Sequence, residues 1–313
     1  MRTALFTHRA CLDHRPPAGH PESPDRLTAV LSGLERLASK SLTELEAPVA
    51  PVDALLRAHS PDLVKKILGP LAEQAKSEGF SAIDPDTIMS SGSAAAALRA
   101  AGAAIAAVDA VMKGDCEAAF CAVRPPGHHA ERARAMGFCL FNNVAIGALH
   151  ARAAHGLSRI AIVDFDVHHG NGTQDIFYND ANLFYASSHQ MPLYPGTGGE
   201  DECGVADNVL NCPLLPGSGS AEFRAIYRDS VLPALADFAP ELILISAGFD
   251  AHRDDPLANL NLVEEDFAWV THEICAIAQK TAKGRVVSSL EGGYDLAALQ
   301  RSAAAHVRAM MES

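Results

Sequence analysis

The sequence predicts an α/β protein with a central parallel sheet flanked by helices. Short apolar runs of strand length alternate with longer segments of helical periodicity, which is the pattern of βα units in a parallel sheet. Five of the apolar runs are followed at once by clusters of Asp, His, Ser or Gly. Because parallel strands end at one edge of a sheet, where open α/β sheets bind their ligands, we expect these clusters to form one composite site.

Residues 1–113 are expected to form one strand and three helices. Residues 3–7 form a short apolar run, which predicts a strand. Residues 24–39 and 60–76 carry apolar side chains at helical spacing. Residues 93–113 are rich in alanine, the strongest helix former, and are followed by Gly114, a residue type that commonly ends helices.

From residue 117 onward, strand-like and helical segments alternate. Its apolar runs of strand length are residues 117–123, 159–163, 183–186, 242–245 and 286–290. Its segments with helical periodicity are residues 142–155, 221–237, 264–281 and 296–311. No Ser/Gly-rich spacer, long charge run or internal repeat divides the chain, so we expect a single domain over residues 1–313.

Charge and cysteine content exclude several function classes. The formal net charge of −13 argues against a broad basic surface that would track a phosphate backbone, so we expect no direct nucleic-acid binding. The seven cysteines include no Cys-x-x-Cys pair, which favours buried thiols in a reducing compartment. The first residues are too soon polar for a signal peptide, and the apolar segment 94–112 contains Arg99 and Asp109. We therefore expect a cytoplasmic protein with no membrane span.

The cluster after residues 159–163 predicts a metal site. Asp164, Asp166 and His168 alternate there, and alternate residues of an extended segment point the same way. Oxygen and nitrogen ligands suit zinc, and a catalytic zinc site needs a third protein ligand and an open position. An oxygen-rich ligand set also leaves Fe2+ open as an alternative. Chemistry alone offers three candidates for the third ligand, namely Asp250, Asp254 and Asp255.

Two further clusters supply groups for acid–base chemistry. His128 and His129 are adjacent in a loop braced by two prolines and a glycine. A metal lowers the pKa of its water to roughly 7, and a neutral imidazole can take the proton. Tyr294 follows two glycines, which allow close approach of the backbone, and a phenol there can donate to a carbonyl oxygen.

These motifs, in this order, resemble the histone deacetylase family. The matching segments are RPPGHHA, GFCLFNN, DFDVHHGNGTQ, YPGTG, SAGFDAH and LEGGYD. Residues 19–27 resemble the class II and bacterial amidohydrolase-like branch, and the resemblance extends from about residue 8 to 294. It implies the arginase/deacetylase fold and a zinc-dependent hydrolase that removes acetyl or another short acyl group from an acylated amine. The favoured substrate is N-ε-acyl-lysine.

The resemblance also implies a role for each residue of the site. Asp250 completes the metal ligands begun by Asp166 and His168. His129 is the general base that later protonates the leaving amine. The remaining catalytic residues are His128 as an electrostatic partner, Asp164 as the carboxylate that orients it, and Tyr294 as the group that polarises the carbonyl.

At position 171 the chain has an asparagine, as members of the class II branch do. Class I members have an aspartate at this position, which pairs with the second histidine. An amide should leave His129 less basic than a carboxylate would.

A substrate tunnel and a potassium site are implied as well. Phe138 and Tyr194 correspond to the aromatic walls of an acyl-lysine tunnel, with Gly137, Leu257 and the rim carboxylate Asp86 beside them. A structural K+ site is implied at Asp164, Asp166, His168, Ser187 and Ser188. Less secure matches are Arg26 as a channel arginine, and His189 and His252 as residues that support the site or are merely structural.

Three other functions stay open on the sequence. An acetylpolyamine deacetylase can carry an acidic gatekeeper where this chain has Leu257, which favours acyl-lysine. An arginase-like ureohydrolase with two Mn ions needs an Asp-x-His-x-Asp motif, but the segment here reads Asp-x-Asp-x-His-His. A non-catalytic acyl-lysine reader has no need of Tyr294. The expected partner is an acylated lysine of a protein or a small acylated amine, and a homo-oligomer is an option because relatives often form dimers or tetramers.

Overall fold

The computed structural model describes residues 2–35, 37 and 42–313, and these are built around one eight-stranded sheet. Its strand order is β2-β1-β5-β10-β9-β6-β7-β8, and each pairing between neighbours is parallel. The strands are β1 (Thr3–Thr7), β2 (Leu42–Glu46), β5 (Ala118–Cys121), β6 (Ile160–Asp164), β7 (Leu183–Gln190), β8 (Val209–Leu214), β9 (Leu242–Ala247) and β10 (Val286–Leu290). The predicted α/β class with a central parallel sheet is confirmed.

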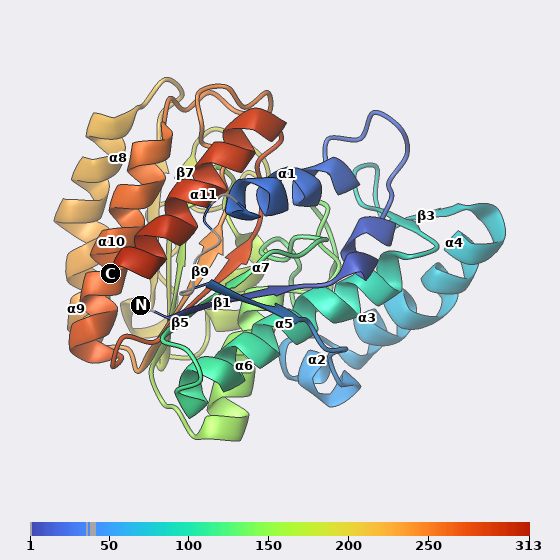
Figure 1. Ribbon diagram of the computed structural model, residues 1–313, viewed down its shortest axis with the longest axis horizontal. Coiled ribbons are helices and arrows are strands. Elements are labelled where there is room, and N and C mark those ends of the chain that lie inside the picture. The colour runs from blue at the N-terminus through green and yellow to red at the C-terminus, as the bar shows by residue number, and fades with distance from the viewer. Residues whose placement is uncertain (1, 36, 38–41) are drawn as a thin grey trace.

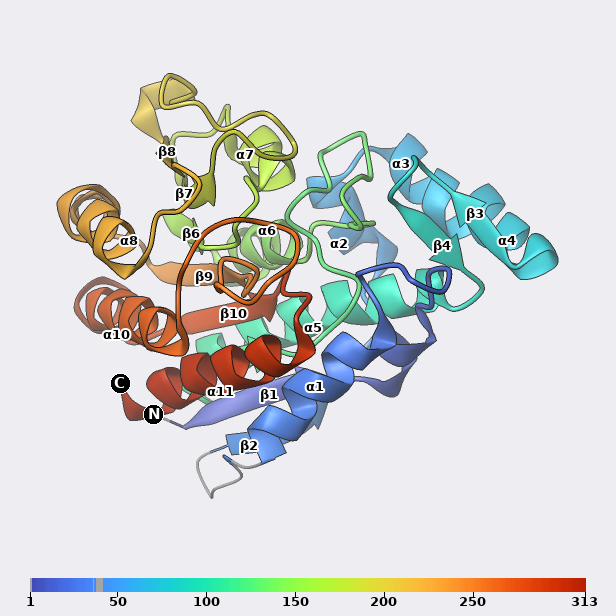
Figure 2. The same ribbon diagram turned by 90° about the horizontal axis from the view of Figure 1, so that it is seen from above.

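Helices cover both faces of this sheet (Figures 1 and 2). On one face, α5 (Ser93–Lys113) packs on β1, β5 and β10, and α6 (Asn143–His155) packs on β6 and β9. On the other face, α11 (Leu296–Glu312) packs against β5 and lies between α1 (Pro24–Glu35) and α10 (Glu264–Thr281). The same layer continues with α9 (Leu232–Phe238) against β7 and α8 (Ser220–Ile226) against β8. Every residue is buried in five adjacent strands, β5, β10, β9, β6 and β7, which explains why their sequences are mainly apolar.

The alanine-rich helix α5 has the predicted bounds. Gly114 follows it in the left-handed conformation, and its backbone N–H donates to the Ala110 carbonyl. By length and composition α5 could cross a membrane, but 67% of its most apolar window is buried inside the fold. Its alanines allow close packing against the sheet and α6, which accounts for this composition.

Three predicted helices differ in their bounds or regularity. The one predicted over residues 221–237 is divided into α8, a π-helical stretch Tyr227–Val231 and α9. The helix predicted over residues 24–39 ends at Glu35, and its positions 36, 38 and 39 lie outside the described residues. The helix predicted over residues 60–76 is divided into α3 (Pro61–Lys66), a π-helical stretch Ile67–Leu71 and α4 (Ala72–Glu78). Pro70 lies in that stretch and has no N–H to donate, so the regular hydrogen-bond ladder cannot pass through it.

Strand β7 corrects one expectation that bears on the site. Ser187, Ser188 and His189 were expected in a loop after the strand, but β7 continues through Gln190. All eight of its residues are buried between β6 and β8, so polar side chains here belong to the strand itself. Asp164 likewise is the last residue of β6, where it pairs with Ser187 on one side and Ser246 on the other.

Several elements were not predicted. They are the edge strands β2 and β8, the helices α2 (Val52–Ala58) and α7 (Asn171–Phe177), and the antiparallel pair β3 (Phe80–Ala82) and β4 (Ile88–Ser90). The expectation of a single domain over residues 1–313 stays a prediction.

Candidate active site

Three predicted metal ligands lie together at the carboxyl edge of the sheet. Asp166, His168 and Asp250 each offer one ligand atom, and these atoms all lie within 4.8 Å of one another. Nδ1 of His168 lies 3.2 Å from Oδ1 of Asp166 and 3.1 Å from Oδ2 of Asp250. All three residues are buried, so two carboxylates and one imidazole converge where bulk water does not screen them.

The segment that carries these ligands is held by turns rather than by an extended strand. Beyond Asp164 the chain bends: Oδ1 of Asp164 accepts the Asp166 N–H, and Oδ1 of Asp166 accepts the His168 N–H. Oδ1 of Asp250 accepts the Val167 N–H at 2.9 Å. The expectation that Asp164, Asp166 and His168 share one side by strand alternation was therefore wrong in its reason. Side-chain to backbone hydrogen bonds position the ligands.

Two glycines make room for the carboxylates. A Cβ on Gly248 would lie 2.0 Å from Oδ2 of Asp166, and one on Gly292 would lie 2.1 Å from Oδ2 of Asp250. The Gly292 N–H also donates to Oδ2 of Asp166 at 2.8 Å. Both positions need glycine because the backbone passes against the ligands.

The donor set fits a divalent ion such as Zn2+. Burial alone would lower the pKa of His168, but the hydrogen bonds that its ring donates to Asp166 and Asp250 raise it to about 10. A divalent cation bound between these three groups would replace the proton on Nδ1. Two carboxylate oxygens and one imidazole nitrogen are ligands that zinc accepts, and three protein ligands leave a position for substrate.

The two adjacent histidines differ in their partners. Nδ1 of His128 lies 3.0 Å from Oδ2 of Asp164. Burial would lower the pKa of His128, but the carboxylates of Asp166 and Asp164 raise it to about 10. Nδ1 of His129 lies 2.8 Å from Oδ1 of Asn171, and an amide oxygen only accepts, so this nitrogen is the donor. Burial, and then the charge of His128, lower the pKa of His129 well below its ordinary value.

Asn171 is held by a network that the sequence did not reveal. Its Nδ2 donates to Oε1 of Glu131 at 2.7 Å and to Sδ of Met136 at 3.3 Å. These contacts fix the orientation of the amide, and with it the tautomer of His129. The Nε2 lone pair of His129 is thereby left for the pocket.

Tyr294 is positioned by a carboxylate from the metal-ligand loop. Oδ2 of Asp255 accepts the Tyr294 N–H at 2.6 Å, and its Oδ1 accepts the Leu257 N–H at 3.1 Å. Burial raises the pKa of the Tyr294 phenol well above its ordinary value, which keeps it a donor. Asp255 thus supports the loop and does not join the metal ligands, while Asp254 is exposed and pairs with Arg301.

The expected channel arginine, Arg26, is fully buried under this loop. Its Nε donates to the Gly293 carbonyl at 2.6 Å, and its guanidinium lies 4.8 Å from the centre of the Tyr294 ring. It pairs with Glu22, which also pairs with Arg124. The buried carboxylate between two guanidinium groups was missed because its partners lie far apart in the sequence.

A pocket of about 370 Å³ opens above these groups. Its lining residues are His20, Pro21, Asp86, His129, Gly137, Phe138, His168, Leu193, Tyr194, Leu257 and Tyr294. All five predicted substrate residues are among them, and His20, Pro21 and Leu193 are additions. The His20 and Phe138 rings lie 4.8 Å apart, and His20 Nε2 lies 2.9 Å from the Asp86 carbonyl. Tyr194 and Asp86 are exposed at the rim.

The residues implied for potassium are neighbours in the structure, and the potassium site itself stays a prediction. Asp164 and Ser187 are direct partners on adjacent strands. Ser187 Oγ lies 2.9 Å from Nδ1 of His189, whereas Ser188 Oγ lies 3.2 Å from the Tyr227 hydroxyl. Successive residues of a strand point to opposite faces, so a site beside the Ser187 hydroxyl could take from Ser188 its backbone carbonyl but not its hydroxyl.

Two remaining histidines have structural partners. Nε2 of His189 lies 3.0 Å from the Gly198 carbonyl oxygen. Nδ1 of His252 accepts the Asp254 N–H at 3.1 Å. Neither residue lines the pocket of the predicted site.

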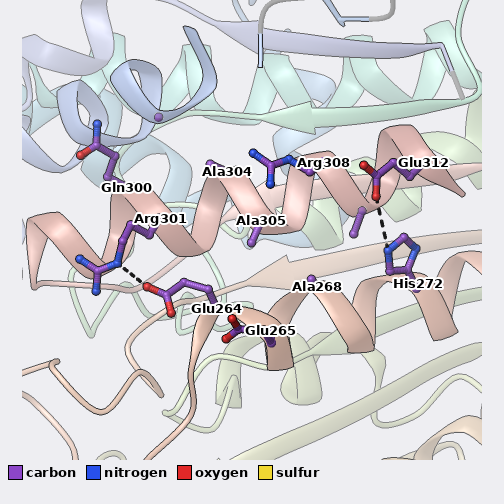
Figure 3. A pocket seen from close by; sticks show the side chains of 12 residues that line it. Glu264, Glu265, Ala268, His272, Gln300, Arg301, Ala304, Ala305, Arg308 and Glu312 are labelled. Atoms are coloured by element: carbon purple, nitrogen blue, oxygen red, sulfur yellow. Dashed lines mark hydrogen bonds and ion pairs between the residues drawn. The ribbon is translucent and has the colours of Figure 1, made fainter. Parts of the chain in front are cut away.

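A second hollow lies elsewhere and lacks this chemistry. Helices α1, α10 and α11 line a groove of about 410 Å³, shown in Figure 3. Its floor includes Ala268, Ala304 and Ala305. Arg301 pairs with Glu264 across it, and no predicted metal ligand or catalytic histidine lines it.

Known proteins resemble this chain over nearly its whole length. The histone deacetylase domain model matches residues 20–310. The chain is 38% identical to the histone deacetylase-like amidohydrolase of Pseudomonas aeruginosa, over 94% of this chain and 82% of that one. It is 39% identical to the type-2 histone deacetylase 2 of Dictyostelium discoideum over its whole length, but spans only 21% of that protein.

A solved structure extends the likeness to the fold. The crystal structure of the HDA15 HD domain superposes with a TM-score of 0.92 at 34% identity, covering 99% of this chain and 88% of that one. The resemblance read from the motifs is confirmed, and the chain belongs to the histone deacetylase domain family of deacetylase-like hydrolases.

Proposed function

We propose that this protein is a zinc-dependent amide hydrolase that removes acetyl or another short acyl group from an N-ε-acyl-lysine side chain. The observation that carries this proposal is the buried cluster of Asp166, His168 and Asp250 beside a pocket lined by His129 and Tyr294. Family membership supports the hydrolase, and the ligand types support zinc, with Fe2+ as the alternative metal.

The shape and polarity of the pocket support acyl-lysine as the substrate class. Phe138 and Tyr194 give it aromatic walls, which suit the methylene stem of a lysine. Leu257 lies at the mouth without a charge, and Asp86 is the carboxylate among the lining residues. Leu257 offers the further ammonium groups of an acylpolyamine no counter-charge, and Asp86 would have to serve them alone, so the polyamine alternative is disfavoured.

The metal ligands, His129 and Tyr294 each lie where they can take part in one step of amide hydrolysis. A divalent ion held by Asp166, His168 and Asp250 would supply Lewis acidity toward a carbonyl and toward water. His129 accepts a proton from water at Nε2, because Nδ1 is engaged with Asn171, and later returns it to the leaving amine. The Tyr294 phenol donates to the acyl oxygen as negative charge develops there.

His128 and Asp164 together influence the protonation state of His129. The Asp164 carboxylate fixes the His128 ring, and the carboxylates of Asp166 and Asp164 together raise its pKa, which favours a positive charge beside His129. Burial, and then that charge, lower the pKa of His129, which favours the neutral imidazole that a base requires. A structural K+ beside Asp164 and Ser187 is a further part of the proposal, supported only by their adjacency across the sheet.

The test is hydrolysis of a panel of acylated lysine peptides and N-acetylated polyamines, with metal content measured on the same sample. We expect turnover of acyl-lysine peptides by protein that carries zinc. A strong preference for acetylpolyamines would contradict the substrate assignment. Binding of acyl-lysine without turnover would identify a reader, and release of urea from arginine by protein with two Mn ions would identify an arginase-like enzyme.

A further inference from the structure

A second group of metal-ligating side chains lies on helices α5 and α6. Oδ1 of Asp109, on α5, lies 2.8 Å from Nε2 of His150 and 2.7 Å from Nε2 of His155, both on α6. One ligand atom from each residue lies within 4.8 Å of the others. The side chains are 33%, 14% and 18% exposed, respectively, so an ion can reach them from solvent.

This cluster is separate from the catalytic pocket. Helix α6 begins at Asn143, just after the segment that carries His129 and Phe138, and it ends at His155 before β6 begins. Its C-terminal end therefore lies at the amino edge of the sheet. Asp109 lies near the end of α5, which likewise leads into the start of β5. Figure 1 shows the two helices side by side on one face of the sheet.

We propose that Asp109, His150 and His155 bind a second divalent transition-metal ion of the Zn2+ class on the outer surface of α5 and α6. Two imidazoles and one carboxylate suit Zn2+, Ni2+ or Cu2+, whereas Ca2+ and Mg2+ prefer all-oxygen sites. Binding at Nε2 requires small outward movements, because zinc holds its ligands at about 2.0–2.2 Å and so spaces them more widely than these hydrogen bonds do.

The charge state of the cluster favours a cation. The Asp109 carboxylate places a negative charge between the two imidazoles, and its side chain is 33% exposed to a cation from solvent. Neither histidine needs to lose its place in the fold to ligate, because both already direct Nε2 at the same oxygen.

Two neighbouring cations limit the affinity. Arg57 Nη1 lies 3.5 Å from Nδ1 of His150, and Lys113 Nζ lies 3.8 Å from Oδ2 of Asp109. When metal binds at Nε2, Nδ1 of His150 carries the proton, so Arg57 has to turn away while keeping its pair with Asp53. That contact is already long, so its loss costs little. We expect binding in the micromolar range, weaker than in the buried catalytic site.

A metal at this position would link the two helices that cover one face of the sheet. A ligand that binds the folded state stabilises it, and the stabilisation grows with the logarithm of the ligand concentration over its dissociation constant. Zinc in excess of the catalytic equivalent should therefore raise the melting temperature of the protein. It should also raise the metal content above one ion per chain.

The test is equilibrium dialysis of the full chain against free Zn2+ from nanomolar to about 100 µM, with zinc measured by elemental analysis. We expect one tight and one weak equivalent in the wild-type protein. The Asp109→Asn/His155→Gln variant should lose only the weak one, and with it the zinc-dependent rise in Tm, while basal hydrolysis stays unchanged. His150→Gln should show the same loss, which guards against misfolding of the double variant.

Two controls separate this inference from the proposed function. His272→Gln removes an exposed histidine on α10 and should retain both equivalents. Asp250→Ala should lose the tight equivalent and keep the weak one. A single equivalent in the wild-type protein over the whole range, or a weak equivalent that persists in Asp109→Asn/His155→Gln, would overturn the second site.

Discussion

Replacing Asn171 by aspartate tests whether His129 is the base and why an amide partners it. The new carboxylate would lie 2.8 Å from Nδ1 of His129. An opposite charge at this distance raises the pKa of a group by about 1–3 units, and each unit corresponds to about 1.4 kcal/mol. The protonated His128 next to it works in the other direction, so about one unit is the expected size of the shift.

Glu131 complicates the single substitution. The Nδ2 atom that the second carboxylate oxygen would replace lies 2.7 Å from Oε1 of Glu131. Two like charges even at 4 Å repel by about 4 kcal/mol at an effective dielectric constant of ~20, so the two carboxyl groups should share a proton near neutral pH. In Asn171→Asp alone the field on His129 is then largely cancelled. Glu131→Gln removes one of the two carboxylates and restores a donor.

The assay is kcat/KM against pH on an acyl-lysine peptide. Activity falls at low pH as the base becomes protonated, so a higher pKa of His129 moves the acid limb upward. We expect Asn171→Asp/Glu131→Gln to move it by about one pH unit relative to the matched control Glu131→Gln, and Asn171→Asp alone to move it less. An acid limb at the same pH in the double variant and its control would show that protonation of His129 does not limit activity.

Three further predictions rest on single contacts. Tyr294→Phe should keep its zinc and its Tm but lose about 10²–10³ in kcat, the usual cost of one oxyanion donor; activity within a few-fold of the wild-type enzyme would mean that another group polarises the carbonyl. Leu257→Glu should raise kcat/KM for N-acetylated polyamines over acetyl-lysine peptides by at most about tenfold, because partly exposed charge pairs contribute only about 1 kcal/mol, and an unchanged ratio would place Leu257 away from the substrate. Burial lowers the pKa of His59 to about 4, so the unfolded chain takes up a proton below about pH 6.5 that the folded chain refuses. His59 should therefore cost about 2 kcal/mol of unfolding free energy between pH 7 and 5, and denaturant titrations of His59→Gln should show a flatter pH dependence; an equal slope in both proteins would contradict this.

The central strands could be predicted because the sheet buries them on both faces. Residues 242–245 of β9 form a short continuous apolar run, and β10 has the expected bounds. The edge strands gave no such signal. Leu42–Glu46 is almost entirely exposed with charged residues at alternate positions, and Val209–Leu214 contains Pro213, which an edge strand tolerates.

Helix α7 and the end of strand β7 were not predicted, for related reasons. Asn171–Phe177 lacks an apolar stripe because its buried residues Asn171 and Gln174 make polar contacts, with His129 and His169 respectively. The end of β7 was missed because Ser187 and His189 look like loop residues, although they are buried within the sheet. In both places buried polar contacts replaced the apolar pattern that local propensity would predict.

The site itself was foreseeable where one short segment carries several reactive side chains. The motifs around Asp166, Asp250 and Tyr294 all fall at ends of strands that topology brings to one edge. Their supports were not foreseeable, because they join distant segments. Glu131 holds Asn171 across 40 positions, and Asp255 holds Tyr294 across 39.

The central claim is that Asp166, His168 and Asp250 hold the metal on which catalysis depends. The most direct measurement is the zinc content and activity of Asp250→Ala beside Asp254→Ala, an exposed carboxylate of the same loop, after dialysis at nanomolar free zinc to empty weaker sites. The structure predicts that Asp250→Ala loses both the tightly bound zinc and turnover, while Asp254→Ala keeps both. Full zinc in Asp250→Ala, with loss of zinc in Asp254→Ala, would contradict the account.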